Sequence, residues 1–221
     1  VYKRQVPARN IVAVPDEVSL EHAAVMMCSS ATSLHALRKG RTGAGDRVAV
    51  FGAGGLGMSA IQLALLEGAS VVYAIDLNGD KLDKAASLGA EPIAATNDPV
   101  EILRRSGGVD VALDLVGSAD VMRQCLDSLA PMGRAVAVGL TADALPVGTY
   151  TDLVTGESEL IGTSDHLKAE IGELLEHAAK GRLLLDDVVG NRVPLDPGAV
   201  NAALDELEAF RGAVRTVICL D

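Results

Sequence analysis

Three glycines at a fixed spacing are the residues of this chain best suited to hold a phosphate group. Gly52, Gly54 and Gly57 form the pattern G-x-G-x-x-G after the apolar run at residues 48–51 and before a helical pattern. The first glycine permits a tight turn, the second lets the backbone approach a pyrophosphate, and the third lets the helix pack on the strand. The amino end of that helix offers free N–H groups to an anion. We therefore expect residues 52–57 to bind a pyrophosphate, with Gly55 and Leu56 among the contacts.

A carboxylate follows at the end of the next apolar run. Asp76 comes about 20 residues after Gly57, the spacing at which an acid binds the ribose of a dinucleotide. A carboxylate there accepts hydrogen bonds from both ribose hydroxyls and would repel a 2′-phosphate, so the pattern predicts NAD rather than NADP. The alternative interpretation is a structural turn followed by a surface acid.

Short apolar runs alternate with helical patterns through the middle of the chain, and these elements must position the glycine loop. Strands are predicted at residues 48–51, 71–75, 92–94, 111–116, 135–138 and 160–161. Helices are predicted at residues 56–67, 81–88, 100–105 and 119–129. This alternation is typical of βαβ units and a parallel sheet. We predict an α/β fold with a doubly wound parallel sheet, the Rossmann arrangement, over residues 30–163.

The two flanking segments lack this alternation. Residues 1–29 contain an Ala-rich helix from Leu20, which Ser19 can cap. Residues 164–221 contain an amphipathic helix, a strand at Val188 and Val189, a helix capped near Asp196, and a last strand at 214–220. We predict that residues 1–29 and 164–221 are parts of one second domain.

Composition and charge exclude several classes of partner. The formal net charge is −11 and no basic run stands out, which argues against binding to nucleic acid or to an anionic membrane surface. No apolar stretch reaches the roughly 20 residues that span a bilayer. The cysteines Cys28, Cys125 and Cys219 are far apart, so no disulfide framework is predicted and a cytoplasmic location is expected.

Further motifs resemble the medium-chain dehydrogenase/reductases, specifically the zinc-dependent alcohol dehydrogenase branch. They lie at residues 15–24, 28–32, 45–48, 114–117, 133–139 and 215–217, so the resemblance covers nearly the whole chain. Each motif is modest alone, but together they are specific. The resemblance implies a zinc-assisted enzyme that transfers hydride between an alcohol or polyol and NAD. It also implies that residues 1–29 and 164–221 belong to an incomplete, GroES-like catalytic domain.

The resemblance further implies roles for individual residues. Cys28 stands where the family has the third protein ligand of its catalytic zinc, although a free cysteine can also be a small buried apolar residue. Contacts to the dinucleotide are implied for Thr32 (nicotinamide), Lys81 (ribose), Val116 (adenine), Gly139 and Leu140 (nicotinamide ring), Ile161 (carboxamide) and Arg215 (pyrophosphate). His166 follows a predicted strand end and is a candidate to line the substrate pocket. His35 is interpreted as structural, and Cys125 and Cys219 as core.

The sequence departs from the family before the glycine loop. The family supplies its other two zinc ligands from that region, but only 47 residues precede Val48 here, without a Cys and His cluster. We therefore expect this chain alone to hold at most one zinc ligand and to be inactive. The first residue is Val1 rather than Met, which favours a segment of a longer enzyme over a naturally short protein.

Two other functions stay open. One is a zinc-independent quinone or enoyl reductase of the same superfamily, and the other is a non-catalytic dinucleotide-binding module. For the leading hypothesis the partner is a small alcohol, aldehyde or ketone. A homo-oligomer, dimer or tetramer, is also expected, with sheet edges pairing near residues 147–160.

The predicted ribose contact can be tested by changing Asp76. Replacing it by Asn or Ser should weaken the binding of NADH more than that of NADPH, because the repulsion of a 2′-phosphate is removed together with the ribose hydrogen bonds. Fluorescence titration with both cofactors measures the two dissociation constants. An unchanged ratio between them would contradict the contact.

Overall fold

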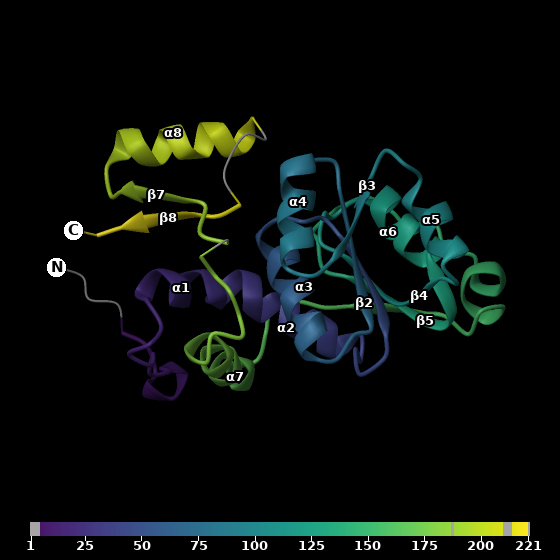
Figure 1. Ribbon diagram of the computed structural model, residues 1–221, viewed down its shortest axis with the longest axis horizontal. Coiled ribbons are helices and arrows are strands. Elements are labelled where there is room, and N and C mark those ends of the chain that lie inside the picture. Colours follow the sequence, from purple (N-terminus) through teal and green to yellow (C-terminus); the bar gives the residue numbers. More distant parts are fainter. Residues whose placement is uncertain (1–4, 187, 210–213, 221) are drawn as a thin grey trace.

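The computed structural model describes residues 5–186, 188–209 and 214–220, and a parallel six-stranded sheet forms one half of it (Figure 1). The strands pair in the order β3-β2-β1-β4-β5-β6, all parallel. Their bounds are β1 (Arg47–Phe51), β2 (Val71–Asp76), β3 (Glu91–Ala94), β4 (Val109–Asp114), β5 (Leu129–Ala137) and β6 (Glu159–Gly162). This is the doubly wound order, with its reversal between β1 and β4. The predicted fold class is confirmed.

Alternate residues of the strands face two separate apolar cores. Val50 and Val72 pack with α2 (Ala31–Lys39), α3 (Gly55–Leu66) and α4 (Gly79–Ser87) on one face. Ala49 and Phe51 pack with α5 (Pro99–Arg105) and α6 (Ala119–Asp127) on the other. Because both faces are covered, the strands are continuous apolar runs. None of the helices in the described ranges combines the length and the apolarity needed to cross a membrane.

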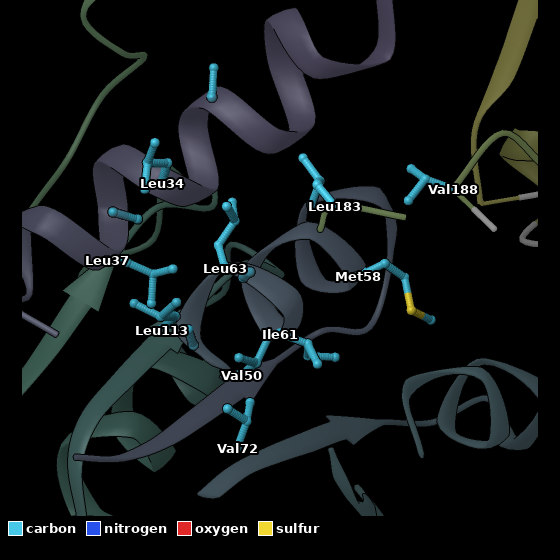
Figure 2. Packing of buried hydrophobic residues seen from close by; sticks show 14 of the residues in the cluster. Leu34, Leu37, Val50, Met58, Ile61, Leu63, Val72, Leu113, Leu183 and Val188 are labelled. Atoms are coloured by element: carbon cyan, nitrogen blue, oxygen red, sulfur yellow. The ribbon is translucent and has the colours of Figure 1, made fainter. Parts of the chain in front are cut away.

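Helix α3 packs against its neighbours on nearly every side. Figure 2 shows its Met58, Ile61 and Leu63 between the sheet, α2 and a later segment of the chain. Its amino end touches β1: a Cβ built on Gly57 would lie 2.0 Å from the carbonyl oxygen of Gly52. Gly52 itself has φ +100°, a conformation that favours glycine. Both glycines are therefore required by the turn from β1 into α3.

The flanking segments form the second part of the molecule (Figure 1). A short turn η1 (Ala8–Asn10) precedes α1 (Leu20–Val25), which continues through a π-helical turn η2 (Met26–Ser30) into α2. The predicted boundary after residue 29 thus falls within one helical run, and the domain division stays a prediction. After β6 come α7 (Lys168–Ala179), β7 (Asn191–Pro194), α8 (Pro197–Glu208) and β8 (Thr216–Cys219), with β7 and β8 paired in parallel.

Two caps were predicted correctly at the start of helices in the flanks. Ser19 Oγ accepts a hydrogen bond from His22 N at 3.1 Å at the start of α1. The Asp196 carboxylate accepts one from Ala199 N at 2.9 Å at the start of α8. Residues 1–4 and 221, at the outer ends of the predicted flanking segments, lie outside the described residues, as do 187 and 210–213.

Four details of the sequence analysis were wrong. The helix predicted at residues 119–129 ends at Asp127, and Leu129 already belongs to β5. Val188 and Val189 are not a strand: they lie in a turn, and they are apolar because they pack into the core of α3. The strand predicted at residues 111–116 ends at Asp114, because the Asp114 carboxylate binds the next backbone N–H groups. Cys219 lies in β8 and is only partly buried, with its thiol 3.6 Å from Glu21 Oε1, whereas Cys125 is fully buried as predicted.

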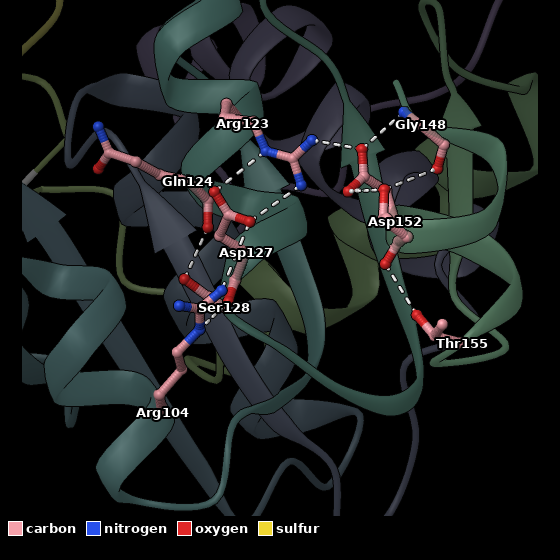
Figure 3. A network of polar contacts seen from close by, with 9 residues as sticks. Arg104, Arg123, Gln124, Asp127, Ser128, Gly148, Asp152 and Thr155 are labelled. Carbon is pink, nitrogen blue, oxygen red and sulfur yellow. Dashed lines mark hydrogen bonds and ion pairs between the residues drawn. The ribbon is translucent and has the colours of Figure 1, made fainter. Parts of the chain in front are cut away.

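An ion-pair network holds the segment between β5 and β6 against α6 (Figure 3). Arg123 of α6 donates to Asp152 Oδ2 at 2.8 Å and to Asp127 Oδ1 at 3.0 Å. Asp152 belongs to η3 (Thr149–Val154) and also accepts a hydrogen bond from Gly148 N at 2.8 Å. The Gly148 N–H and the Arg123 guanidinium hold the pKa of Asp152 below its ordinary value of 3.8. The charged form of Asp152 is therefore favoured in the folded chain.

This network predicts a pH-dependent stability. Asp152→Asn should lower the free energy of unfolding at about pH 7, and the difference from wild type should shrink as the pH falls below about 4. The sign follows because a lowered folded-state pKa gives stability above the unfolded-state pKa, and that stability is lost as pH falls through the folded value. Urea denaturation at several pH values measures it. Asp143→Asn, at an exposed carboxylate with no ion pair among the described residues, is the control. A difference that stays constant across this range would contradict the network's role.

The contact between Gly57 and Gly52 predicts a packing defect. Gly57→Ala should lower the free energy of unfolding by about 1–3 kcal/mol, because the new methyl group overlaps the Gly52 carbonyl. Gly172→Ala in α7 is the matched control: it meets nothing within 4 Å and should stabilise the chain by about 0.5–1 kcal/mol through helix propensity. Thermal or urea unfolding separates the two. Equal effects of both substitutions would show that the close approach is absent.

Candidate dinucleotide-binding site

A cavity of about 460 Å³ opens at the carboxyl ends of β1, β2 and β4. This is the edge of a doubly wound sheet where ligands bind. Five residues predicted to bind the cofactor line the cavity together: Gly52, Gly54, Asp76, Lys81 and Val116. The remaining wall is mostly apolar, from Phe51, Ile75, Leu77, Ala95, Leu115 and Val121, with Gln124 as a polar member. The arrangement suits a flat ring at one end and a sugar at the other.

The glycine loop leaves space where the pyrophosphate is expected. A Cβ built on Gly54 would meet nothing within 4 Å, so the side of Gly54 that would carry a side chain is open. Gly54 is the N-cap of α3, and no side chain caps this helix. The first N–H groups of α3 therefore have no side-chain acceptor from the described residues, and the positive end of the helix dipole is uncovered.

Asp76 has a structural bond in addition to its predicted role. Its Oδ2 accepts a hydrogen bond from Ala53 N of the glycine loop at 2.8 Å, and its Oδ1 accepts one from Asn78 N at 2.9 Å. Each carboxylate oxygen has a second lone pair, so acceptors remain for ribose hydroxyls. The carboxylate thus fixes the glycine loop to the end of β2 and lines the cavity at the same time. Measurements on Asp76 variants need a stability control for this reason.

Arg215 lies against the start of α3. A Cβ built on Gly55 would be 2.2 Å from Arg215 Nε, so the guanidinium group covers the position where a side chain would begin. Among the described residues, none forms an ion pair or a side-chain hydrogen bond with this guanidinium. A cation at the amino end of a helix is electrostatically unfavourable. The arrangement therefore leaves positive potential between Arg215 and the glycine loop, and the predicted pyrophosphate contact of Arg215 stays a prediction.

The loops after β4 and β5 touch each other next to the cavity. Asp114 is 2 % exposed, and its Oδ1 accepts hydrogen bonds from Val116 N and Gly117 N, both at 2.9 Å. Gly139 N in turn donates to the Asp114 backbone oxygen at 2.8 Å. Leu140 follows and is 95 % exposed. Val116, Gly139 and Leu140 are thereby brought to the same sheet edge.

Cys28 lies in a second hollow of about 330 Å³, which it shares with Arg215, Thr216 and Val217. The π-helical turn η2 exposes its side chain while Ser29 and Ser30 are buried. Within the described residues, no group of three or more His, Cys, Asp or Glu side chains could hold a metal ion. These residues therefore do not provide a zinc site by themselves, and the metal role of Cys28 stays a prediction.

Three other predicted residues are not joined to this edge by any contact described. Thr32 lies half-buried in the first turn of α2, and Ile161 lies in β6 opposite Val136. His166 lies between β6 and α7, with Nδ1 2.6 Å from Asp165 Oδ1 but without hydrogen-bond geometry. Their predicted roles remain untested. His35 bonds through Nδ1 to the buried Glu170 at 2.9 Å, which supports its structural interpretation.

Sequence reasoning missed several residues of the cavity. Ala95 and Gln124 line it from the end of β3 and from α6, but nothing in their local patterns indicates this. Asp114 carried a usable signal, because an acid at a strand end followed by glycine is typical of a turn in which the carboxylate binds the backbone. Gln62 of α3 does not line the cavity and was also missed, because apart from Ser59 its helix is apolar.

Comparison with known proteins agrees with this architecture. A family model described as zinc-binding dehydrogenase matches residues 55–180. The chain is 33% identical over 190 residues to (R,R)-butanediol dehydrogenase of Bacillus subtilis, covering 83% of this chain and 53% of that protein. It is 30% identical over 226 residues to S-(hydroxymethyl)glutathione dehydrogenase of Saccharomyces cerevisiae, covering 96% and 58%. The chain thus spans somewhat more than half the length of these relatives.

Solved structures give the same result. The 2R,3R-butanediol dehydrogenase from Bacillus subtilis superposes with a TM-score of 0.84 at 29% identity, over 93% of this chain and 59% of that one. The alcohol dehydrogenase TADH from Thermus sp. ATN1 superposes with a TM-score of 0.82 at 29% identity, over 94% and 60%. With its sheet order, glycine loop and matched segment, the chain belongs to the zinc-binding dehydrogenase family, in the zinc-dependent alcohol dehydrogenase branch of the medium-chain dehydrogenase/reductases.

Proposed function

We propose that this chain is the NAD-binding part of an oxidoreductase that transfers hydride between a small alcohol or polyol and the nicotinamide. The observation that carries the proposal is the Arg215 guanidinium over the uncapped amino end of α3, without an ion pair or side-chain hydrogen bond from any described residue. Two sources of positive potential, the helix end and the guanidinium, meet there, and together they favour an anion such as a pyrophosphate.

The chain's own residues would bind and orient such a ligand. The backbone at Gly54, Gly55 and Leu56 would donate to the pyrophosphate while Arg215 neutralises it. Asp76 and Lys81 would bind the adenosine ribose, and Val116 would contact the adenine. Gly139, Leu140, Ile161 and Thr32 would contact the nicotinamide end, and His166 would line the substrate pocket. NAD, when bound, supplies the ring carbon that accepts or gives up the hydride.

Two features favour NAD over NADP and an alcohol dehydrogenase over a quinone or enoyl reductase. Asp76 lines the cavity at the end of β2, where its charge would repel a 2′-phosphate. The named relatives are dehydrogenases of alcohols and of S-(hydroxymethyl)glutathione. The described residues do not fit zinc on their own, so the role proposed for this chain is to bind and orient the dinucleotide. The third hypothesis, a non-catalytic module, assumes the same dinucleotide site but no hydride transfer.

We infer the remaining properties from the family. The substrate would be a small alcohol, aldehyde or ketone, and the location would be cytoplasmic. A homo-oligomer could form at β6, the edge strand of the sheet, since an unpaired edge can accept another strand.

The dinucleotide site predicts a separation between stability and binding. Gly54→Val should abolish measurable NADH binding, because the side chain would fill the space needed by the pyrophosphate. It should leave the melting temperature close to that of wild type, because a Cβ there meets nothing within 4 Å. NADH fluorescence titration and thermal unfolding measure the two effects.

Gly79→Val is the control for this experiment. Gly79 also has an open Cβ position, but it starts α4 and does not line the cavity. Its variant should therefore bind NADH like wild type. NADH binding that survives in Gly54→Val would place the pyrophosphate elsewhere and overturn the proposed function.

A further inference from the structure

A buried glutamine in α3 holds a segment that belongs to the C-terminal flank. We call this segment the strap: residues 182–190, of which all but 187 are described. Gln62 Oε1 accepts a hydrogen bond from Leu184 N at 2.7 Å, and Gln62 Nε2 donates to the Leu184 backbone oxygen at 3.0 Å. The side-chain amide thus pairs with both backbone groups of one residue, its N–H and its C=O, as a neighbouring strand would.

Apolar burial secures the strap around this amide. Leu183, Leu185, Val188 and Val189 are each at most 4 % exposed and belong to the core that contains α3. Figure 2 shows Leu183 and Val188 beside Met58 of α3. Gln62 is only 6 % exposed, so its amide depends on protein partners for its hydrogen bonds. The strap is therefore fixed relative to the glycine-loop helix at this point.

The end of the strap bonds to Arg215. Gly190 N and Asn191 N both donate to the Arg215 backbone oxygen, at 2.9 Å and 3.1 Å. The Arg215 guanidinium, in contrast, has no side-chain partner among the described residues. The position of this cation over Gly55 thus depends on its backbone, and its backbone depends on the strap. Gln62 and Gly55 lie on the same helix, so α3 carries both the anion site and the anchor of the arginine that completes it.

We propose that Gln62 is a positioning residue for dinucleotide binding: it holds the strap so that Arg215 lies over the amino end of α3. The proposal rests on the proposed function, because it assumes that Arg215 contacts a pyrophosphate. It adds a residue that is not in the cavity and would not touch the ligand. Substituting Gln62 should therefore weaken the binding of ligands that contain a pyrophosphate and leave the affinity for ligands without one unchanged.

The test compares two ligands that differ in that part. ADP-ribose contains the pyrophosphate and adenosine does not, and both would occupy the cavity beside Asp76. Gln62→Met keeps the side-chain volume but removes both hydrogen bonds to Leu184. Gln62→Leu also removes both hydrogen bonds and places no charge in this buried position. Leu103→Ala, in the core on the opposite face of the sheet, is a destabilising control that leaves the strap intact. The Arg215→Ala variant lacks the guanidinium group, so in that variant a substitution of Gln62 should have no further effect on ligand affinity.

We expect Gln62→Met to weaken ADP-ribose binding about tenfold, the effect of misplacing one hydrogen bond to a charged group. Adenosine binding should not change, Gln62→Leu should show a similar loss, and Leu103→Ala should bind both ligands like wild type. In the Arg215→Ala background, Gln62→Met should have no further effect. Calorimetry for ADP-ribose and NMR titration for adenosine provide the constants. If Gln62→Met does not fold, the same comparisons are made with Gln62→Leu.

Several results would overturn the proposal. Equal losses for adenosine and ADP-ribose would mean that Gln62 acts on stability alone, and a loss that persists without Arg215 would mean that it acts by another route. If Arg215→Ala weakens ADP-ribose binding but neither Gln62 variant does, the positioning role is wrong while the proposed function stands. If the wild-type chain binds no ADP-ribose, the proposed function fails and this inference fails with it.

Discussion

The burial of α3 on nearly all sides is the constraint on which the other features depend. One side of this helix packs on the sheet, another on α2, and a third on the strap. Such a helix cannot shift without opening the core, since protein interiors are closely packed. Its two polar side chains in the middle, Ser59 and Gln62, are each matched by a partner: Ser30 Oγ at 3.0 Å and the Leu184 peptide. The amino end of α3 is consequently held in one place relative to β1.

The ends of the candidate site differ in charge because of this arrangement. The Asp76 carboxylate lies at the end of β2, and the Arg215 guanidinium lies over Gly55. The two residues differ in what else they hold. The Asp76 carboxylate also accepts a hydrogen bond from Ala53 N of the glycine loop, so its loss would change the shape of the site as well as its charge. Arg215 bonds the strap through its backbone oxygen, so loss of its guanidinium would change mainly the charge.

Local patterns in the sequence were sufficient to predict the sheet and the glycine loop. The apolar runs around Val50 and Val72 and the spacing of Gly52, Gly54 and Gly57 depend on neighbours close in the chain, so their structure could be predicted. The resemblance to a family predicted that Arg215 lies at the glycine loop, as it does, although the two are far apart in the sequence. What could not be predicted rests on contacts between distant residues. Val188 and Val189 resemble a strand because they are apolar and β-branched, but it is the packing of the strap on α3 that buries them. The role of Gln62 could not be predicted for the same reason, since its hydrogen-bond partner lies 122 residues away in the sequence.

The π-helical turn η2 has a consequence for how the two parts of the molecule are joined. Ala31 N donates to Met26 O, five residues back, so the turn holds one residue more than an α-helical turn would. Since each residue of an α-helix rotates the chain by about 100°, this additional residue sets the rotation of α1 relative to α2. Glu21 of α1 binds Arg192 of β7 at 2.7 Å and lies 3.6 Å from Cys219 of β8. The length of the turn η2 therefore determines the direction from which the β7–β8 sheet approaches the nucleotide fold. A relative with one residue fewer there would have to attach that sheet through a different face of α1.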